Sequence, residues 1–384
     1  MPAWKHALLS RILMISLCIL SGLWVADYDT SGEAAYASNV KNSVDKLIRA
    51  CFAPFARWDA LYYVHIAEEG YTHENLHAFY PGFPLMLRLS GALIELVTCY
   101  QLSLTTCILM GGVLLNNGFF VLSTHLIYHL SLIAHNVLFP SASTSLQKQR
   151  QSRRVEWRSR EVFAWRAALC FAYQPASIFY SVLYTESLFT LLVLVSMACL
   201  LAASGKNRNG NGEEEEEEKK FCYFYYWLSV LFLTAASAVR SNGVVLFLIL
   251  LGERLRWCGS VRCLTPGRCL QMLETLVIGG CFIALPHVTM QVWGASRYIV
   301  PNSTLFGLIP AHYQQIQATY WNQGLFHYWT VAQLPNFLLA APIWWWTFCM
   351  LRQFYPCFLS VGVRQDDDGK GKGTDTEGKM WLRL

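Results

Sequence analysis

Long apolar runs are the feature that most constrains what this chain can fold into. Segments of about 20 residues that are nearly free of charge recur along the sequence, and a helix of that length crosses a bilayer. They are Ala7–Val25, Phe83–Tyr100, Thr105–Leu130, Phe163–Phe179, Leu188–Ala203, Phe221–Val239, Leu273–Trp293 and Val331–Met350. Of the 384 residues, 54% are hydrophobic and only 14% are charged, a balance that a water-soluble globule could not hide. We therefore expect an all-α polytopic membrane protein with about eight or more transmembrane helices.

The first apolar run is predicted to remain in the protein as a membrane anchor. The small-residue pattern Ala35-Tyr36-Ala37 lies well beyond the apolar segment, whereas a signal peptide is cleaved close to its own apolar segment. Basic residues near the span ends cluster at 147–160 and 252–268, which favours the cytosolic side for both. Lys5 and Arg11 place the N-terminus on that side too.

These assignments predict a single polytopic domain over residues 1–352, followed by a polar, disordered tail over 353–384. The predicted cytosolic loops cover about 136–162, 204–220 and 252–271, and the loops on the far side cover about 26–78 and 294–330. The acidic run Glu213–Glu218 is interpreted as part of a solvated loop, because adjacent like charges repel and resist packing.

Strict alternation across the membrane raises one conflict. It would put the first basic loop on the wrong side if Phe83–Tyr100 and Thr105–Leu130 both crossed. One of these two segments is therefore predicted to be interfacial or re-entrant. The sequence does not say which.

Several classes of function find no support in the sequence. The 13 cysteines are odd in number and form no CxxC pair, so neither a disulfide framework nor a zinc site is indicated. No Gly-rich nucleotide fingerprint and no GxSxG motif is present. The net charge of +5 is explained by the cytosolic loops, and we expect no nucleic-acid partner.

Polar and aromatic residues gather instead in the first far-side loop. Asn39–Ala53 is predicted to be an amphipathic helix on the membrane surface, because apolar side chains recur at helical spacing opposite charged ones, among them Asp45 and Arg49. The stretch RWDALYYVHIAEEGY, residues 57–71, follows it and combines ionisable groups with aromatic rings. Such a gathering at a membrane edge usually marks a substrate path or a catalytic pocket.

Four ordered motifs carry a resemblance to a known family. They are RWDALYYVHIAEEGY followed by AFYPGFPL, PASIFYSVLYTESLF (Pro175–Phe189), AVRSNG (Ala238–Gly243) and YWNQGLFHYWTVAQLPNFLLAAP (Tyr320–Pro342). Together they resemble the PIG-V family of GPI mannosyltransferases, which are lipid-dependent glycosyltransferases of the endoplasmic reticulum membrane with the GT-C architecture. The chain ends at Leu384, where members of the family continue into further hydrophobic sequence.

The resemblance implies a reaction and its substrates. The second mannose would pass from dolichyl-phosphate mannose to the first mannose of the GPI-anchor precursor on the lumenal face, with an α-1,6 bond formed by inversion. We expect no cofactor and no metal beyond this lipid-linked donor, and a small membrane subunit is a candidate partner. The alternatives are a non-catalytic subunit of a mannosyltransferase complex and a lipid transporter or scramblase, although no internal symmetry of a transporter is visible.

The acceptor hydroxyl needs a carboxylate as general base, and Asp59 is the leading candidate. The alternative is that Asp59 caps the helix predicted to start at Ala60. Asp27, with Asp29 beside it, competes for the catalytic role, because GT-C enzymes commonly place an essential acid just after the first membrane helix.

The leaving phosphate needs positive charge or N–H donors rather than a proton. Arg240 is the first candidate, and Arg57, His73 and His77 are the others. The alternative for Arg240 is an interhelical ion pair with Glu186. The two histidines could equally be interfacial polar residues.

Sugar binding calls for flat apolar faces together with hydrogen-bonding edges. The candidates that combine these features are Trp58, Glu186, Tyr320, Trp321, Asn322, Gln333 and Asn336. An aromatic belt at the membrane interface would explain the Trp and Tyr residues, but not the amides.

Overall fold

The computed structural model describes residues 2–25, 39–138, 146–204, 212–258, 266–298, 304–305, 309–324 and 326–361. Its helices are α1 (Ala3–Trp24), α3 (Ser43–Phe52), α4 (Asp59–Glu69), α5 (Gly82–Val97), α6 (Leu104–Leu138), α7 (Leu146–Ala172), α8 (Glu186–Ser204), α9 (Gly212–Val239), α10 (Phe247–Cys258), α11 (Pro266–Arg297), α12 (His312–Trp321) and α13 (Leu334–Val361). The 3₁₀ turns are η1 (Ala53–Phe55), η2 (Glu74–Ala78), η3 (Pro175–Tyr180), η4 (Ser241–Leu246) and η6 (Val331–Gln333). Two short strands, β1 (Thr304–Leu305) and β2 (Ile309–Pro310), pair antiparallel.

The all-α membrane fold expected from the sequence is confirmed. Within the described residues, five segments are long and apolar enough to cross a membrane: Ala3–Trp24, Leu104–His135, Glu186–Ala203, Leu276–Arg297 and Val331–Arg352. Tyr223–Val239 is a shorter apolar helix. Each of these six segments coincides with one of the predicted apolar runs.

Some predicted boundaries are wrong because polar residues also form helix. Helix α7 begins at Leu146, inside the loop predicted at 136–162, and it ends at Ala172, whereas the predicted span was Phe163–Phe179. Lys, Arg, Gln and Glu are good helix formers, which favours helix in the basic segment. Pro175 opens η3 and removes the N–H that a continuing helix would need.

Two further polar segments are helical where loops were predicted. Helix α9 begins at Gly212 and includes the acidic run Glu213–Glu218, since acidic residues are favourable at the positive end of the helix dipole. Helix α13 continues to Val361, so the predicted disordered tail is wrong over 353–361. The rest of that tail, 362–384, lies outside the described residues.

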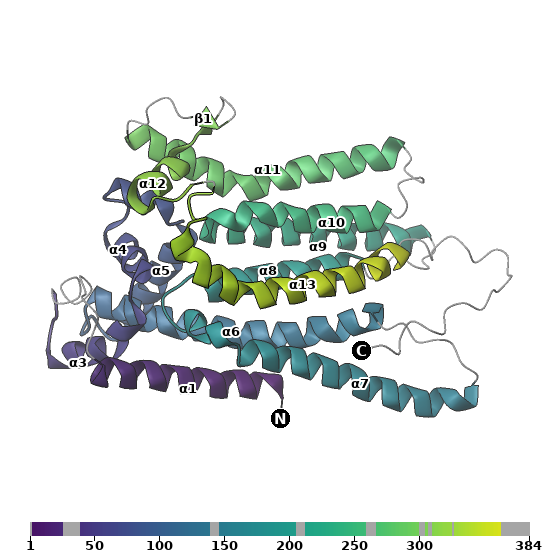
Figure 1. Cartoon of the computed structure of the whole chain (residues 1–384), viewed down its shortest axis with the longest axis horizontal. Coiled ribbons are helices and arrows are strands. Elements are labelled where there is room, and N and C mark those ends of the chain that lie inside the picture. Colours follow the sequence, from purple (N-terminus) through teal and green to yellow (C-terminus); the bar gives the residue numbers. More distant parts are fainter. Residues whose placement is uncertain are drawn as a thin grey trace. The chain divides into compact units, whose positions relative to one another are not determined.

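The chain divides into two compact units. The first consists of Met1–Leu250 and Leu276–His327, and the second of Leu251–Thr275 and Tyr328–Leu384. Within the first unit, α1, α6, α7, α8 and α9 lie side by side, and α3, α4 and α5 gather at one end, on the left of Figure 1. We call this the α4 end of the unit. Its apolar core lies where α4, α5, α6 and the start of α8 meet, around Tyr63, Phe83, Ile108 and Leu183.

Helix α5 makes no net crossing between α1 and α6. Gly22 at the end of α1 packs so closely on Pro54 of η1 that a Cβ there would collide with the proline ring. Arg49 of α3 donates a 3.1 Å hydrogen bond to Thr106 at the start of α6. The chain therefore leaves α1 and enters α6 at the same end of the unit. With 16 residues, α5 is about 24 Å long, which is shorter than the ~30 Å apolar layer of a bilayer.

Helix α3 turns its charged face toward the protein. Asp45 and Arg49 are buried, and both hydrogen-bond Ser103, at 3.0 Å to Asp45 Oδ1 and 2.6 Å from Arg49 Nη2. Val44 and Leu47 on the opposite face are 61% and 66% exposed. The apolar face predicted to lie on a membrane surface is thus the face that no protein covers in the described residues.

Arg11 is buried among protein groups. Its side chain is 1% exposed and donates to Ser177 O at 2.8 Å and to Ser181 Oγ at 2.9 Å. The guanidinium also lies 3.7 Å from the centre of the Phe120 ring. A buried Arg with these partners holds α1 against η3, and the cytosolic assignment of the N-terminus stays a prediction.

Candidate active site at the α4 end

Asp59 is the first residue of α4, where the chain turns sharply into the helix. Trp58 occupies the N-cap position with φ 53° and ψ −120°, a conformation that is strained for a residue with a side chain. The N–H groups of Ala60 and Leu61 donate to the carbonyls of Arg57 and Trp58, at 3.2 and 3.0 Å. The proposed cap by Asp59 is therefore wrong, since Trp58 holds that position and backbone carbonyls accept from the first turn.

Trp58 is oriented away from the core, with 75% of its surface exposed. A strained backbone that holds a large apolar ring in the open is unfavourable unless the ring has a partner. The indole is thus available to stack on a sugar face, as predicted, but the stacking itself remains a prediction.

An ion pair stands beside Asp59. Arg240 Nη1 lies 2.6 Å from Glu186 Oε1 and donates a hydrogen bond to it, which is the alternative considered for Arg240 in the sequence. The guanidinium carbon also lies 5.7 Å from the centre of the Phe189 ring. The other carboxylate oxygen, Glu186 Oε2, is buried and makes no hydrogen bond to any described residue. Glu186 Oε2 thus has no donor among the described residues, while the side chains of Glu186 and Arg240 are both partly exposed.

The three charged groups act on one another electrostatically. Burial raises the pKa of Asp59, the negative charge of Glu186 raises it further, and the positive charge of Arg240 opposes both. Asp59 is an exposed residue, and desolvation is nevertheless the largest cause of the upward shift of its pKa. A carboxylate with raised proton affinity is better suited to accept a proton than an ordinary surface Asp.

Two tyrosines from the sequence motifs complete this side of the site. Tyr63 is buried, its hydroxyl hydrogen-bonds the Thr185 side chain, and burial followed by the charge of Asp59 raises its pKa. Burial and Asp59 raise the pKa of Tyr184 to about 12, and its hydroxyl makes a long 3.5 Å contact to Arg57 O. Both phenols therefore stay neutral near pH 7. The sequence analysis missed them, although both lie inside the quoted motifs.

Asn116 is a third residue that sequence reasoning missed. Its Nδ2 group donates to the carbonyls of Val182 and Tyr184, at 2.5 and 2.9 Å. The N–H of Leu183 donates to Phe55 O at 3.0 Å, which ties the same segment to η1. These bonds fix the backbone directly before Glu186. A buried amide in the apolar run of α6 was the available signal.

The two predicted phosphate-binding histidines have different surroundings. His73 is exposed, and its Nδ1 hydrogen-bonds Thr72 at 2.8 Å. His77 is 2% exposed, with Trp293 and Tyr71 rings at 4.8 and 4.9 Å between centres. Burial lowers the pKa of His77, so it is a neutral imidazole enclosed by aromatic rings. A phosphate would reach His73 directly, but would have to displace rings to reach His77.

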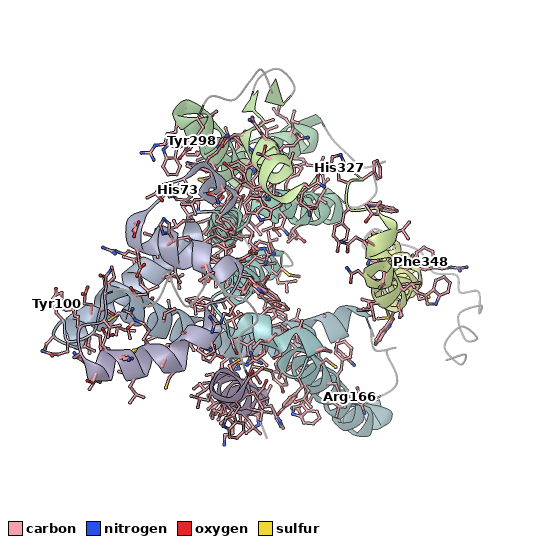
Figure 2. All side chains as sticks on the ribbon, turned by 60° about the vertical axis from the view of Figure 1, so that its left-hand side comes forward. His73, Tyr100, Arg166, Tyr298, His327 and Phe348 are labelled. Atoms are coloured by element: carbon pink, nitrogen blue, oxygen red, sulfur yellow. The ribbon has the colours of Figure 1, made fainter. Side chains whose placement is uncertain are left out.

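The end of α11 closes this region. Tyr298, labelled in Figure 2, contacts His77, with 5.4 Å between the ring centres. Arg297 also donates a 3.2 Å hydrogen bond to Tyr71 O. Residues that are more than 220 positions apart in the chain, such as Tyr71 and Arg297, thus share one surface at the α4 end.

The sugar-binding candidates of α12 lie against the same end. Trp321 makes edge contacts with Tyr62 of α4 and with Phe79, at 6.2 and 6.0 Å between ring centres. Tyr320 donates a 3.1 Å hydrogen bond to Glu74. Asn322 ends the helix in the left-handed conformation, with φ 51° and ψ 36°. Trp321 is therefore a structural neighbour of α4, and Tyr320 and Asn322 remain accessible beside it.

The remaining candidates lie outside the described residues of the first unit. Gln333 and Asn336 are in the second unit, where Asn336 Nδ2 donates to Gln333 Oε1 at 2.5 Å. Asp27 and Asp29 lie outside the described residues, so their competing catalytic role stays a prediction. Among the residues that the structure covers, no group of three or more His, Cys, Asp and Glu side chains is arranged to hold a metal ion.

A membrane-spanning helical bundle with a carboxylate and an ion pair at one end has the parts of a membrane-embedded transferase. Comparison with known proteins gives the class as glycosyltransferase. The family described as "Mannosyltransferase (PIG-V)" matches residues 3–375 of the chain. The chain therefore belongs to the PIG-V mannosyltransferase family, and the resemblance carried by the four motifs is confirmed.

The similar proteins include mammalian and insect members. "GPI alpha-1,6-mannosyltransferase 2" of Rattus norvegicus is 28% identical over 396 residues, which cover 95% of this chain and 71% of the rat protein. The Homo sapiens protein of that name is 26% identical over 398 residues, with coverages of 95% and 72%. "GPI mannosyltransferase 2" of Drosophila melanogaster is 27% identical over 373 residues, with coverages of 88% and 73%. No solved structure matches the chain.

Proposed function

We propose that this mannosyltransferase forms an α-1,6 bond from the first mannose of a GPI-anchor precursor to a mannose supplied by dolichyl-phosphate mannose, on the lumenal side of the endoplasmic reticulum membrane. The names of the relatives that align over 95% of the chain carry the proposal. The bilayer and the GPI glycolipid are its partners, and a small membrane subunit is a further proposed partner. No cofactor or metal is included in the proposed reaction.

Asp59 is the proposed general base. It accepts the proton of the acceptor 6-hydroxyl while that oxygen bonds to the anomeric carbon of the donor, and the bond from this carbon to the phosphate oxygen breaks with its electron pair. The raised pKa of Asp59 supports this role, since burial and Glu186 both increase its affinity for the proton. Attack opposite the leaving group converts a β-linked donor into an α-linked product.

Arg240 is the proposed partner of the departing phosphate. Dolichyl phosphate leaves with an added negative charge, which an Arg in a partly desolvated site stabilises more strongly than in water. In the structure Glu186 accepts one hydrogen bond from Nη1, and a guanidinium carries five N–H donors in all. Glu186 thus orients Arg240, and the N–H groups directed away from Glu186 serve the phosphate.

Reconstitution tests the proposal. The purified chain is placed in liposomes with labelled dolichyl-phosphate mannose and a GPI precursor that carries one mannose, with the rat relative in parallel. We expect label in a two-mannose lipid that an α-1,6-specific mannosidase removes. Flipping of lipid without any transfer would favour the scramblase alternative. Activity restored only by adding a second, catalytic mannosyltransferase, and not by adding the small membrane subunit, would favour the non-catalytic alternative. Either result, with the rat protein active, overturns the proposal.

A further inference from the structure

A hydrogen-bonded chain of side chains joins four elements of the first unit. The Tyr80 hydroxyl bonds His287 Nδ1, and His287 Nε2 lies 3.2 Å from Gln291 Nε2. Gln291 Oε1 accepts a 2.8 Å hydrogen bond from the backbone N–H of Tyr313. The Tyr313 hydroxyl then lies 2.9 Å from Ser241 Oγ. This polar chain connects the start of α5 to α11, α12 and η4.

The donors and acceptors along the polar chain are consistent in one arrangement. Gln291 Oε1 accepts from Tyr313, so the NH₂ group of the same amide is directed at His287 and donates to its Nε2. Nδ1 of a neutral His287 then carries the proton and donates to the Tyr80 oxygen. A cationic imidazole would present an N–H to the Gln291 NH₂ group, so the arrangement requires neutral His287.

Burial makes this chain of bonds structurally costly to interrupt. Tyr80 is 2% exposed and Gln291 is 6% exposed. A buried polar group that loses its partner destabilises the fold by about 1–3 kcal/mol. Fully paired polar networks of this kind rigidify the elements that they join. Nothing in the proposed reaction uses Tyr80, His287, Gln291 or Tyr313.

The last member of the polar chain is the neighbour of Arg240. Arg240 sits at the corner between α9 and η4, where its N–H donates to Ala236 O at 3.2 Å and its carbonyl accepts from Gly243 at 2.9 Å. A Cβ at Gly243 would overlap the Ser237 backbone, so η4 folds back directly onto α9. The α9 side of the corner is thus held by backbone contacts. The Ser241 side is held by Tyr313.

We propose that Tyr313 is a positioning residue for Arg240. Its hydroxyl fixes Ser241, and the corner then presents the Arg240 guanidinium to Glu186 and to the phosphate of the donor. Tyr80, His287 and Gln291 in turn hold the Tyr313 backbone in place. The inference rests on the proposed function of Arg240. Displacement of a charged group by about 1 Å can lower a rate up to 100-fold, which is why one bond at this corner affects catalysis.

The first test compares rates. Tyr313→Phe keeps the ring and removes the hydroxyl, and Ser241→Ala removes its partner. We expect each to lower kcat about tenfold with little change in the KM for the acceptor, and the double variant to lose no more than either single one. Tyr173→Phe is the control, because its hydroxyl contacts only His6 among the described residues and lies outside the site. Full kcat in Tyr313→Phe overturns the positioning role.

The second test asks whether Tyr313 acts through Arg240. In an Arg240→Lys background, which is slower but keeps the charge, Tyr313→Phe is expected to cause no further loss. A tenfold loss in both backgrounds contradicts the proposal. Thermal unfolding of the same variants needs no activity, and destabilisation by Tyr313→Phe and Ser241→Ala should be less than additive. Additive destabilisation would show that the two hydroxyls do not hydrogen-bond to each other, and would overturn the positioning role. A wild-type chain that transfers no mannose would instead overturn the proposed function.

Discussion

Arg240 donates a 2.6 Å hydrogen bond to Glu186, and the two charges of this pair have opposite effects on the proton affinity of Asp59. Glu186 raises the pKa of Asp59 and Arg240 lowers it. A base and an anion-binding group that influence one another suit a reaction in which a proton and a phosphate leave the sugars in one step. The pH dependence of the rate should therefore respond to both partners.

Glu186→Gln should move the acidic limb of the pH–rate profile to lower pH. Asp59 must be ionised to accept a proton, so the rate rises as pH increases through its pKa. Removing the negative charge of Glu186 and leaving Arg240 in place lowers that pKa, since one raising cause is lost and the opposing one stays. The profile of kcat/KM against pH, in the variant and the wild type, checks this. A limb that stays in place or moves upward contradicts the assignment.

Gly243→Ala should destabilise the corner that carries Arg240. The new Cβ would overlap the Ser237 backbone, and overpacking of this kind typically costs about 1–3 kcal/mol. Gly118 on α6 offers a matched control, because a Cβ there has no atom within 4 Å in the described structure. Gly118→Ala should be neutral or stabilising by up to about 1 kcal/mol. Thermal unfolding in detergent measures both, and equal behaviour of the two variants refutes the close approach of η4 to α9.

Asn116→Ala should lower the rate of catalysis, because Asn116 holds the segment directly before Glu186. Without the amide, the carbonyls of Val182 and Tyr184 lose their donor, and the segment before Glu186 is free to shift. We expect a kcat reduced by about tenfold or more. Thr124→Val is the control, because its buried hydroxyl donates only within α6, to Phe120 O at 2.9 Å. A Thr124→Val rate as low as that of Asn116→Ala would show that any buried polar loss in α6 has the same effect.

Hydropathy predicted where the apolar helices lie, but it gave no information on which residues contact one another. Apolar runs such as Leu188–Ala203 report burial in lipid or protein, and that property is local to the segment. The burial of Arg11 was not predicted, because a charge inside an apolar run can lie either at a membrane boundary or in the protein interior with polar partners. Its partners Ser177 and Ser181 are more than 160 residues away. No local pattern could distinguish the two outcomes.

In the candidate site too, sequence motifs indicated some of the residues and tertiary contacts revealed others. The motifs indicated Asp59, Arg240 and Glu186, and the structure brings the pair of Arg240 and Glu186 together. Asn116 and Tyr313 were missed. The amide of Asn116 stands out in an apolar run, but no spacing in the sequence indicates its partners, and a tyrosine in a polar segment gives no signal. The partners of both residues are set by tertiary contacts.

Asp59→Asn should be at least as stable as the wild type near pH 7. Because the pKa of Asp59 is raised in the fold, the folded protein binds this proton more tightly than the unfolded chain does. Stability therefore falls as pH rises from the unfolded Asp range, near about 3.9, through the raised pKa, and the ionised form destabilises the fold above it. Asn removes that charge. A melting temperature well below the wild-type value would instead indicate a structural role for the carboxylate.

The rate of mannose transfer by purified Asp59→Asn, measured beside Glu69→Gln from the same helix, tests the central claim most directly. Glu69 is exposed on α4, with 63% of its side chain accessible, so its variant should transfer mannose at the wild-type rate. General base catalysis contributes about 100- to 10,000-fold, and we predict a loss of at least about 100-fold in kcat for Asp59→Asn. Transfer by Asp59→Asn within a few-fold of the wild-type rate would contradict the account.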